Sequence, residues 1–120
     1  MSSIDQNVKR GSAELAILSL LQAAKLHGYE IAKRIEQQSG GTLKFDVASL
    51  YPLLYRMERD GWVKAEWGES SSGRKRRYYV LTREGRSQLA PLRAQWQLLF
   101  EALNKIAGLQ PDVRLEGGKA

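Results

Sequence analysis

The spacing of the apolar residues changes twice along the chain, and this change limits the folds that it can adopt. Apolar residues recur at intervals of three and four up to about residue 60, which predicts helices over 11–24, 29–38 and 46–60. The interval then becomes two, which predicts strands over 63–67 and 76–81. The helical spacing returns after the second strand. The sequence therefore predicts a mainly α-helical chain with one small β-hairpin.

Turn and capping residues indicate where the predicted helices end. His27 interrupts the apolar pattern between the first two helices. The glycines at 40–41 end the second helix, because glycine tolerates the left-handed backbone of a helix C-terminus. Asp46 is a suitable N-cap for the third helix, but Pro52 would then lie beyond the first turn and remove a backbone hydrogen bond. Either the first turn is irregular or the regular helix begins near Ser49.

The order of these elements is that of a winged helix-turn-helix with an added C-terminal helix. We assign residues 11–82 to the winged helix-turn-helix domain. Residues 83–107 form the added helix, which Thr82 caps. The polar residues 1–10 predict a flexible N-terminal arm, and the residues from 108 to 120 predict a flexible tail. The hairpin between the third and fourth helices is the wing of this fold.

Composition narrows the function classes. The formal net charge of +6 favours an acidic partner, either nucleic acid or an anionic membrane surface. The chain has no cysteine, which excludes a disulfide scaffold, a zinc finger and a thiol nucleophile. The N-terminus lacks the apolar stretch of a signal peptide, and the run from Leu15 to Leu21 is too short to span a bilayer. We therefore expect a cytoplasmic protein without a membrane partner.

The sequence offers no catalytic or metal-binding constellation. His27 is the only histidine, and neither a second histidine nor a cysteine is available to complete a metal site. Ser49 lacks a nucleophile-elbow pattern and a candidate base. His27 is better explained as a residue that starts a helix. We expect a protein that is not an enzyme and that needs no metal and no cofactor.

Four consecutive basic residues follow the turn of the hairpin directly: Arg74, Lys75, Arg76 and Arg77. In a two-residue alternation they cannot all face the core, so some must project from the wing. Projecting cations there can neutralise DNA phosphates. The plain alternative is a solvated loop of charges. The preceding three helices favour the DNA-binding interpretation.

The third helix occupies the position of a recognition helix. Its outward face predicts contacts with DNA from five residues, namely Ser49, Tyr51, Pro52, Tyr55 and Arg56. Tyr51 lies near the edge of the apolar face, so core packing with an exposed hydroxyl is an alternative. Arg56 is placed to reach a guanine edge, or it pairs with Asp60 one turn along.

The last helix has more apolar surface than a small winged domain needs to cover. An alternating spacing of three and four joins most of its apolar residues, and the predicted dimer interface consists of Leu89, Leu92, Trp96, Leu99, Phe100, Leu103 and Ile106. The alternative is that this strip folds back on its own domain. Pro91 should kink or break the helix near Ala90.

Several motifs in order resemble the PadR family of transcriptional regulators. They are Gly11-Ser12-Ala13-Glu14-Leu15, His27-Gly28-Tyr29-Glu30-Ile31, Ser49-Leu50-Tyr51-Pro52, Arg56-Met57-Glu58, Gly61-Trp62 and Tyr78-Tyr79-Val80-Leu81-Thr82 with Gly85. The resemblance implies a homodimer that binds a palindromic operator in double-stranded DNA, usually as a repressor. Some members of the family release DNA when a small aromatic or lipophilic effector binds. Trp96 is the residue that would border such an effector pocket here.

A second interpretation keeps the fold and changes the partner. A winged helix with a basic wing can also bind protein or RNA. The sequence alone does not separate this interaction module from an operator-binding regulator.

Overall fold

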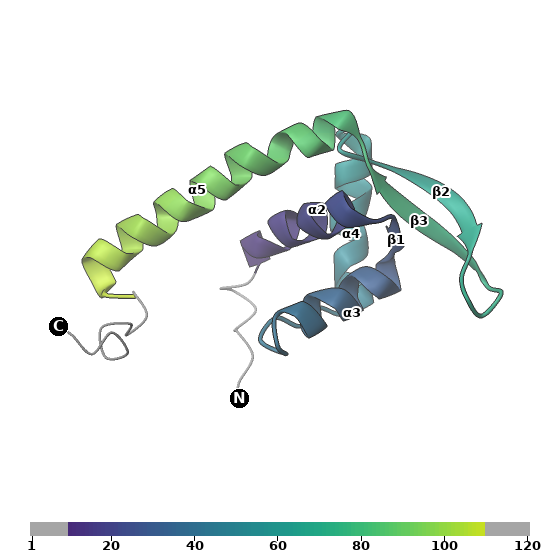
Figure 1. The fold of residues 1–120 in the computed structure, drawn as a ribbon, viewed down its shortest axis with the longest axis horizontal. Helices are drawn as coiled ribbons and strands as arrows, with labels where there is room; N and C mark the ends of the chain where they lie inside the picture. The colour runs from purple at the N-terminus through teal and green to yellow at the C-terminus, as the bar shows by residue number, and fades with distance from the viewer. Residues whose placement is uncertain (1–9, 110–120) are drawn as a thin grey trace. The chain divides into compact units, whose positions relative to one another are not determined.

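The computed structural model describes residues 10–109 and divides into two units, residues 1–89 and 90–120. Its elements, in chain order, are η1 (Arg10–Ser12), α2 (Ala13–Ala23), β1 (Leu26–His27), α3 (Gly28–Gln38), α4 (Val47–Arg59), β2 (Val63–Glu69), β3 (Lys75–Leu81) and α5 (Arg83–Ala107) (Figure 1). The predicted arm over 1–10 and tail over 108–120 lie almost wholly outside the described residues. The predicted helices and hairpin are confirmed, within two residues at each end.

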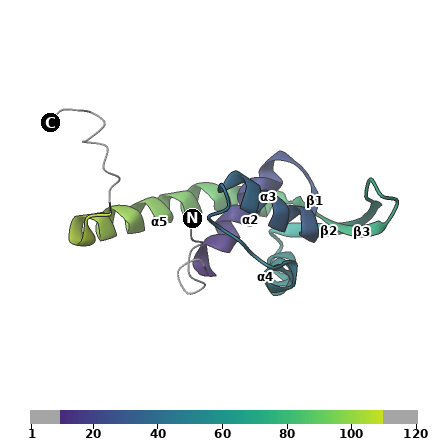
Figure 2. The same ribbon diagram turned by 90° about the horizontal axis from the view of Figure 1, so that it is seen from below.

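The first unit is a winged helix-turn-helix. Figures 1 and 2 show α2, α3 and α4 grouped beside the sheet, with the hairpin of β2 and β3 extending away from them. The buried side chains come from these three helices, from the strands and, with Leu89, from the first part of α5. They form the core: Ala13, Ile17, Leu18, Leu21, Leu26, Ile31, Ala32, Ile35, Leu50, Leu54, Met57, Val63, Tyr79, Leu81 and Leu89. The apolar stripes that predicted the helices are the faces that they bury.

The sheet has one strand that the sequence did not predict. Within the described residues the strands are antiparallel in the order β1-β3-β2. Leu26 pairs with Tyr79 and His27 with Tyr78, so β1 covers the second edge of β3. A strand of two residues is too short to show a two-residue alternation, which is why the pattern did not reveal it.

His27 starts α3, as predicted. Its Nδ1 accepts a hydrogen bond from the backbone N–H of Glu30, and the Glu30 carboxylate accepts one from the backbone N–H of His27, which completes a capping box. The imidazole is buried and lies edge-on to Tyr78, with ring centroids 5.3 Å apart. Burial lowers the pKa of His27 below its ordinary value. The carboxylate of Glu30 raises this pKa in part, whereas the positive charge of Arg76 lowers it further.

The lowered pKa of His27 predicts that stability depends on pH. In the unfolded chain His27 takes up a proton near pH 6.5, its ordinary pKa. In the folded chain its pKa is lower, so protonation favours unfolding. The contribution of His27 to the free energy of unfolding is therefore complete above pH 6.5, and it is lost as the pH falls below that value. Urea unfolding from about pH 7.5 down to about pH 5.5 should give a falling free energy of unfolding.

His27→Asn is the matched control, because asparagine can still cap the helix but does not titrate. The variant should show a flatter pH profile over the same range. A wild-type profile as flat as that of the variant would contradict a lowered pKa at His27.

The first turn of α4 is tight, and Pro52 lies inside the helix. The backbone N–H of Ser49 bonds to the carbonyl of Asp46, three residues back, and the Ser49 hydroxyl donates to the same carbonyl. The side chain of Asp46 forms no capping hydrogen bond. Of the two interpretations of Pro52, the irregular first turn is therefore the one observed, with the helix beginning at Val47.

The start of α5 is tied to the beginning of the hairpin. The Thr82 hydroxyl accepts a hydrogen bond from the backbone N–H of Gly85, which confirms Thr82 as the cap. The same hydroxyl can donate a hydrogen bond to the carbonyl oxygen of Gly61 or of Trp62. The backbone N–H of Thr82 also bonds to the Trp62 carbonyl, at 3.0 Å. These bonds press the first turn of α5 against Trp62.

Pro91 does not break α5. The helix continues through it to Ala107, so the predicted break near Ala90 is wrong, and the alternative of a kink there stays a prediction. A proline removes one N–H from the helix, and the flanking turns of a long helix can hold the geometry around it. Gly108, in the left-handed conformation, ends the helix with its N–H bonded to the Asn104 carbonyl.

Candidate nucleic-acid interface

Helix α4 has one buried face and two different exposed flanks. Leu50, Leu54 and Met57 are buried in the core of the first unit. The helical period places Tyr51, Tyr55 and Glu58 on the flank toward the wing, and Ser49, Pro52, Leu53 and Arg56 on and beside the opposite flank. Tyr55, Pro52 and Arg56 are exposed, as predicted for a surface that meets a partner.

The flank of α4 toward the wing is held by an aromatic and ionic cluster. The rings of Tyr51 and Tyr55 stack with centroids 5.8 Å apart. Arg77 of β3 donates a hydrogen bond of 2.9 Å to the carboxylate of Glu58, and its guanidinium lies over the rings of Tyr55 and Tyr79. Arg77 therefore joins the wing to α4 instead of projecting freely into solvent.

Tyr51 also contacts the start of α3. A Cβ built at Gly28 would lie only 2.9 Å from the Tyr51 hydroxyl oxygen, so glycine leaves the space that this ring occupies. Tyr51 is half-buried, which agrees with the interpretation that its ring packs at the edge of the core, and its hydroxyl lies against Gly28. Its ring thus has Tyr55 on one side and the start of α3 on another.

The four basic residues of the wing have three different environments. Arg74 and Lys75 are exposed at the turn. Arg76 is half-buried and lies on the face of the hairpin opposite to that of Arg77, because neighbouring residues of β3 alternate. Arg77 is bound to Glu58. The prediction that the four could not all face the core is confirmed, because Arg74 and Lys75 are exposed.

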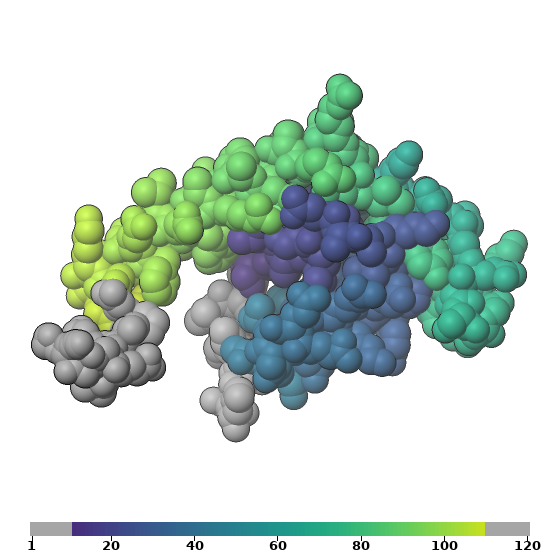
Figure 3. Space-filling view, in the orientation of Figure 1, coloured from purple at the N-terminus to yellow at the C-terminus, as the bar shows by residue number. Residues whose placement is uncertain are grey.

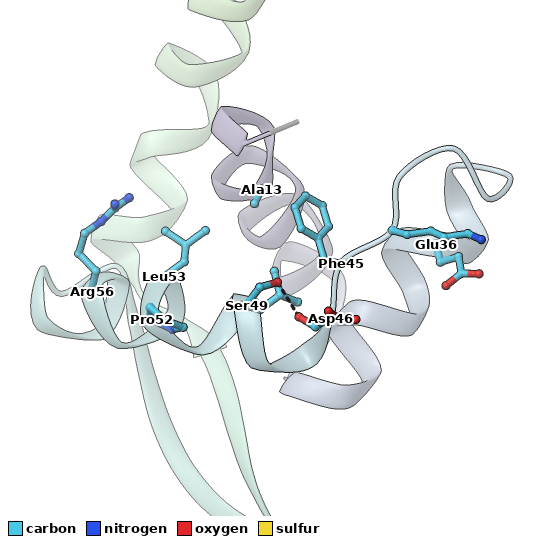
Figure 4. A pocket seen from close by; sticks show the side chains of 10 residues that line it. Ala13, Glu36, Phe45, Asp46, Ser49, Pro52, Leu53 and Arg56 are labelled. Carbon is cyan, nitrogen blue, oxygen red and sulfur yellow. Dashed lines mark hydrogen bonds between the residues drawn. The ribbon is translucent and has the colours of Figure 1, made fainter. Parts of the chain in front are cut away.

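The other flank of α4 borders a pocket of about 620 Å³. Figure 4 shows Phe45, Asp46, Ser49 and Leu53 around it, together with Ala13 of α2 and Glu36 of α3. Arg56 lies at its margin and forms an ion pair with Glu14 of α2. The acid that pairs with Arg56 is therefore Glu14 and not Asp60, which instead lies 3.4 Å from Arg59.

Three residues of this surface could not be identified from the sequence. Glu58 and Glu14 hold Arg77 and Arg56, across 19 and 42 positions of sequence, so no local spacing could have paired them. Trp67 of β2 is 69% exposed and lies opposite Arg77 in the sheet register. An apolar residue at an alternating position of a strand is usually assigned to the core. Trp67 is exposed because the hairpin extends beyond the core at this point.

The second unit consists of the part of α5 from residue 90 onward. Its apolar residues are incompletely covered: Leu92 and Trp96 are half-exposed, and Leu99, Phe100, Leu103 and Ile106 are exposed, Ile106 at 84%. Leu98 is exposed as well. Leu89 differs from the other predicted interface residues, since it is buried in the core of the first unit.

Neither a membrane span nor a metal site is present in the described part of the chain. None of the helices between residues 10 and 109 is long and apolar enough to cross a membrane. The same residues include no group of three or more histidine, cysteine, aspartate or glutamate side chains that could hold a metal ion.

Comparison with known proteins identifies the family. The chain is 32% identical to a transcriptional regulator from Clostridium thermocellum, with a TM-score of 0.77 over 87% of this chain and 98% of that one. A PadR family regulator from Eggerthella lenta is 29% identical, with a TM-score of 0.74 over 87% and 88%. A protein of Lysinibacillus sphaericus is 29% identical over 84% of this chain and 93% of its own. The sequence model of the PadR-like transcriptional regulator family matches residues 17–91, so the chain belongs to this family of regulators, which are not enzymes.

Proposed function

We propose that the chain is a sequence-specific repressor that binds a palindromic operator in the cytoplasm as a homodimer. The observation that best supports this is the surface joining α4 to the wing, where Arg77 bonds Glu58 and stacks on Tyr55. A recognition helix must be held in register with the backbone contacts beside it to select bases. The exposed Arg74 and Lys75 at the turn of the wing would supply such backbone contacts.

The homodimer is proposed from the second unit. An exposed apolar strip along a helix usually marks a protein interface, and the residues at spacings of four and three form a coiled-coil type seam. The strip that we propose consists of Leu92, Trp96, Leu99, Phe100, Leu103 and Ile106. Leu89 is left out because it is buried in the first unit.

We propose that a small aromatic effector binds beside Trp96. The indole is half-exposed on the apolar strip, so its two-fold mate would approach it in the dimer. A flat aromatic ligand could stack between two such rings. Titration of small aromatic compounds should quench tryptophan emission in wild type and not in Trp96→Phe. Equal quenching of the two proteins would place the ligand elsewhere.

Duplex binding is the direct test of the proposed function. Fluorescence anisotropy with a labelled promoter duplex should show binding that weakens steeply with salt, because phosphate contacts release counterions. Unlabelled RNA of the same sequence should compete poorly. Equal competition by RNA, or no duplex binding, would favour an interaction module instead.

Arg56 gives a sharper test of base selection. A bidentate contact with guanine discriminates by about 1–3 kcal/mol, so Arg56→Ala should relax the preference at one position of each half-site. Selection of random duplexes by both proteins measures this directly. Tyr51→Phe should instead reduce affinity more than selectivity, if its hydroxyl meets a phosphate.

Glu14→Gln is the matched control for Arg56. It removes the ion pair of Arg56 and keeps the guanidinium, so its selected motif should equal that of wild type. Identical motifs from wild type and Arg56→Ala would show that Arg56 serves the ion pair with Glu14 and not the bases.

A further inference from the structure

A second concave surface lies on the first unit, between α3 and the turn of the wing. This notch has a volume of about 360 Å³. Lys33 and Arg34 line it from α3, Arg76 from β3, and the three serines at 70–72 from the turn. In Figure 3 the surface of α3 (blue) adjoins that of the wing (teal). The notch lies apart from the pocket that Arg56 borders, since the two share no lining residue.

The notch has an excess of positive charge without internal compensation. Among residues 10–109, none of Lys33, Arg34 and Arg76 forms an ion pair, although other cations of the unit do. Glu30 is the one acid that lines it, and its carboxylate is engaged by the backbone N–H of His27. Three cations thus face a space with one committed carboxylate, which is an arrangement that attracts an anion.

Arg76 gives an independent reason to expect a ligand. Its Nε is buried and has no hydrogen-bond partner among the described residues. Buried guanidinium N–H groups almost always meet an acceptor, because leaving a charged donor unsatisfied is costly. The hydroxyls of Ser70 and Ser72, 2.9 Å apart, add donors at the edge of the notch. An oxyanion is the acceptor that suits guanidinium, ammonium and hydroxyl donors together.

We propose that this notch binds a phosphate group of the DNA backbone, a contact that rests on the proposed function. Lys33 and Arg34 would then extend the cationic surface of the wing onto α3. Arg76 would contact phosphate on its own face of the hairpin while Arg77 holds the wing to α4. Contacts of this kind position a protein on the duplex and contain no sequence information.

The test is the double variant Lys33→Gln with Arg34→Gln. Removing one phosphate-binding cation should lower the slope of log affinity against log salt by roughly 0.9, so the slope of the double variant should be shallower by about two units. Affinity should fall by about tenfold or more at about 0.15 M salt, equally for operator and for random duplex. The base motif selected from random DNA should not change.

The control is Arg86→Gln with Lys105→Gln, two exposed cations of α5. It removes the same charge from the chain, so it separates a local contact from the effect of net charge. The proposal would be overturned if the slope of log affinity against log salt were unchanged in the variant with Lys33→Gln and Arg34→Gln. An equal decrease of that slope in the control would overturn it as well. Wild type that binds no duplex would overturn the proposed function and this inference together.

The source of the phosphate can be distinguished by NMR of the Arg76 Nε–Hε group in wild type. The proposal predicts a shift of this signal on adding duplex DNA and none with millimolar inorganic phosphate. A shift with inorganic phosphate and none with duplex would assign the notch to a free phosphate ligand and overturn the contact with DNA.

Discussion

Gly85→Ala is expected to destabilise the first unit by about 3 kcal/mol, at the upper end of the range for overpacking. A Cβ at this position would lie 2.0 Å from the backbone carbonyl oxygen of Trp62 and 2.8 Å from a methyl carbon of Leu81. The carbonyl cannot turn away, because the hydrogen bonds of Thr82 fix it. Thermal unfolding should show a midpoint lower by roughly 12–24 °C.

Ser87→Ala is the control for this effect. Ser87 is exposed two residues further along α5, so its replacement should change the free energy of unfolding by about 0.5 kcal/mol at most. If Gly85→Ala unfolds at the wild-type temperature, then the first turn of α5 does not lie against the Trp62 carbonyl.

Leu99→Asp with Leu103→Asp should convert the proposed homodimer to a monomer. Both side chains are exposed on the proposed seam, and a carboxylate buried there would lack a partner. A monomer engages one half-site at a time, so operator affinity should fall by about 100-fold or more. Sedimentation equilibrium measures the mass, and anisotropy with the operator measures the affinity.

Ala94→Asp with Gln97→Asp places two acids on the other side of the same helix, at exposed positions. This control should remain dimeric and keep its affinity. Wild type that sediments with the mass of one chain would contradict the homodimer. A dimeric Leu99→Asp, Leu103→Asp variant would move the interface away from the seam.

The helices and the hairpin were predictable because each buries a stripe of its own sequence. Leu50, Leu54 and Met57 repeat at helical spacing, and Val63 and Ala65 alternate on the strand that follows. The break predicted at Pro91 was wrong because the rule for proline is local, whereas the turns on either side of it maintain α5.

The candidate site was predictable in position and not in its contacts. The two-residue alternation of β3 predicts that Arg76 and Arg77 lie on opposite faces of the hairpin. It could not predict that Glu58, which lies on α4, binds Arg77. The pair of Arg56 and Glu14 joins two helices in the same way. Such pairs depend on tertiary packing, which no spacing along the chain describes. The notch beside Lys33 and Arg34 also forms only when the turn of the wing folds next to α3.

Selection from a pool of random duplex DNA by the wild-type protein tests the central proposal most directly. A homodimer that reads bases with α4 should enrich one motif with two-fold symmetry. Its half-sites should be about one helical turn apart, or a multiple of that distance. If the protein binds the pool but enriches no motif, its contacts are with the backbone alone, and the proposal of a sequence-specific operator-binding regulator is contradicted.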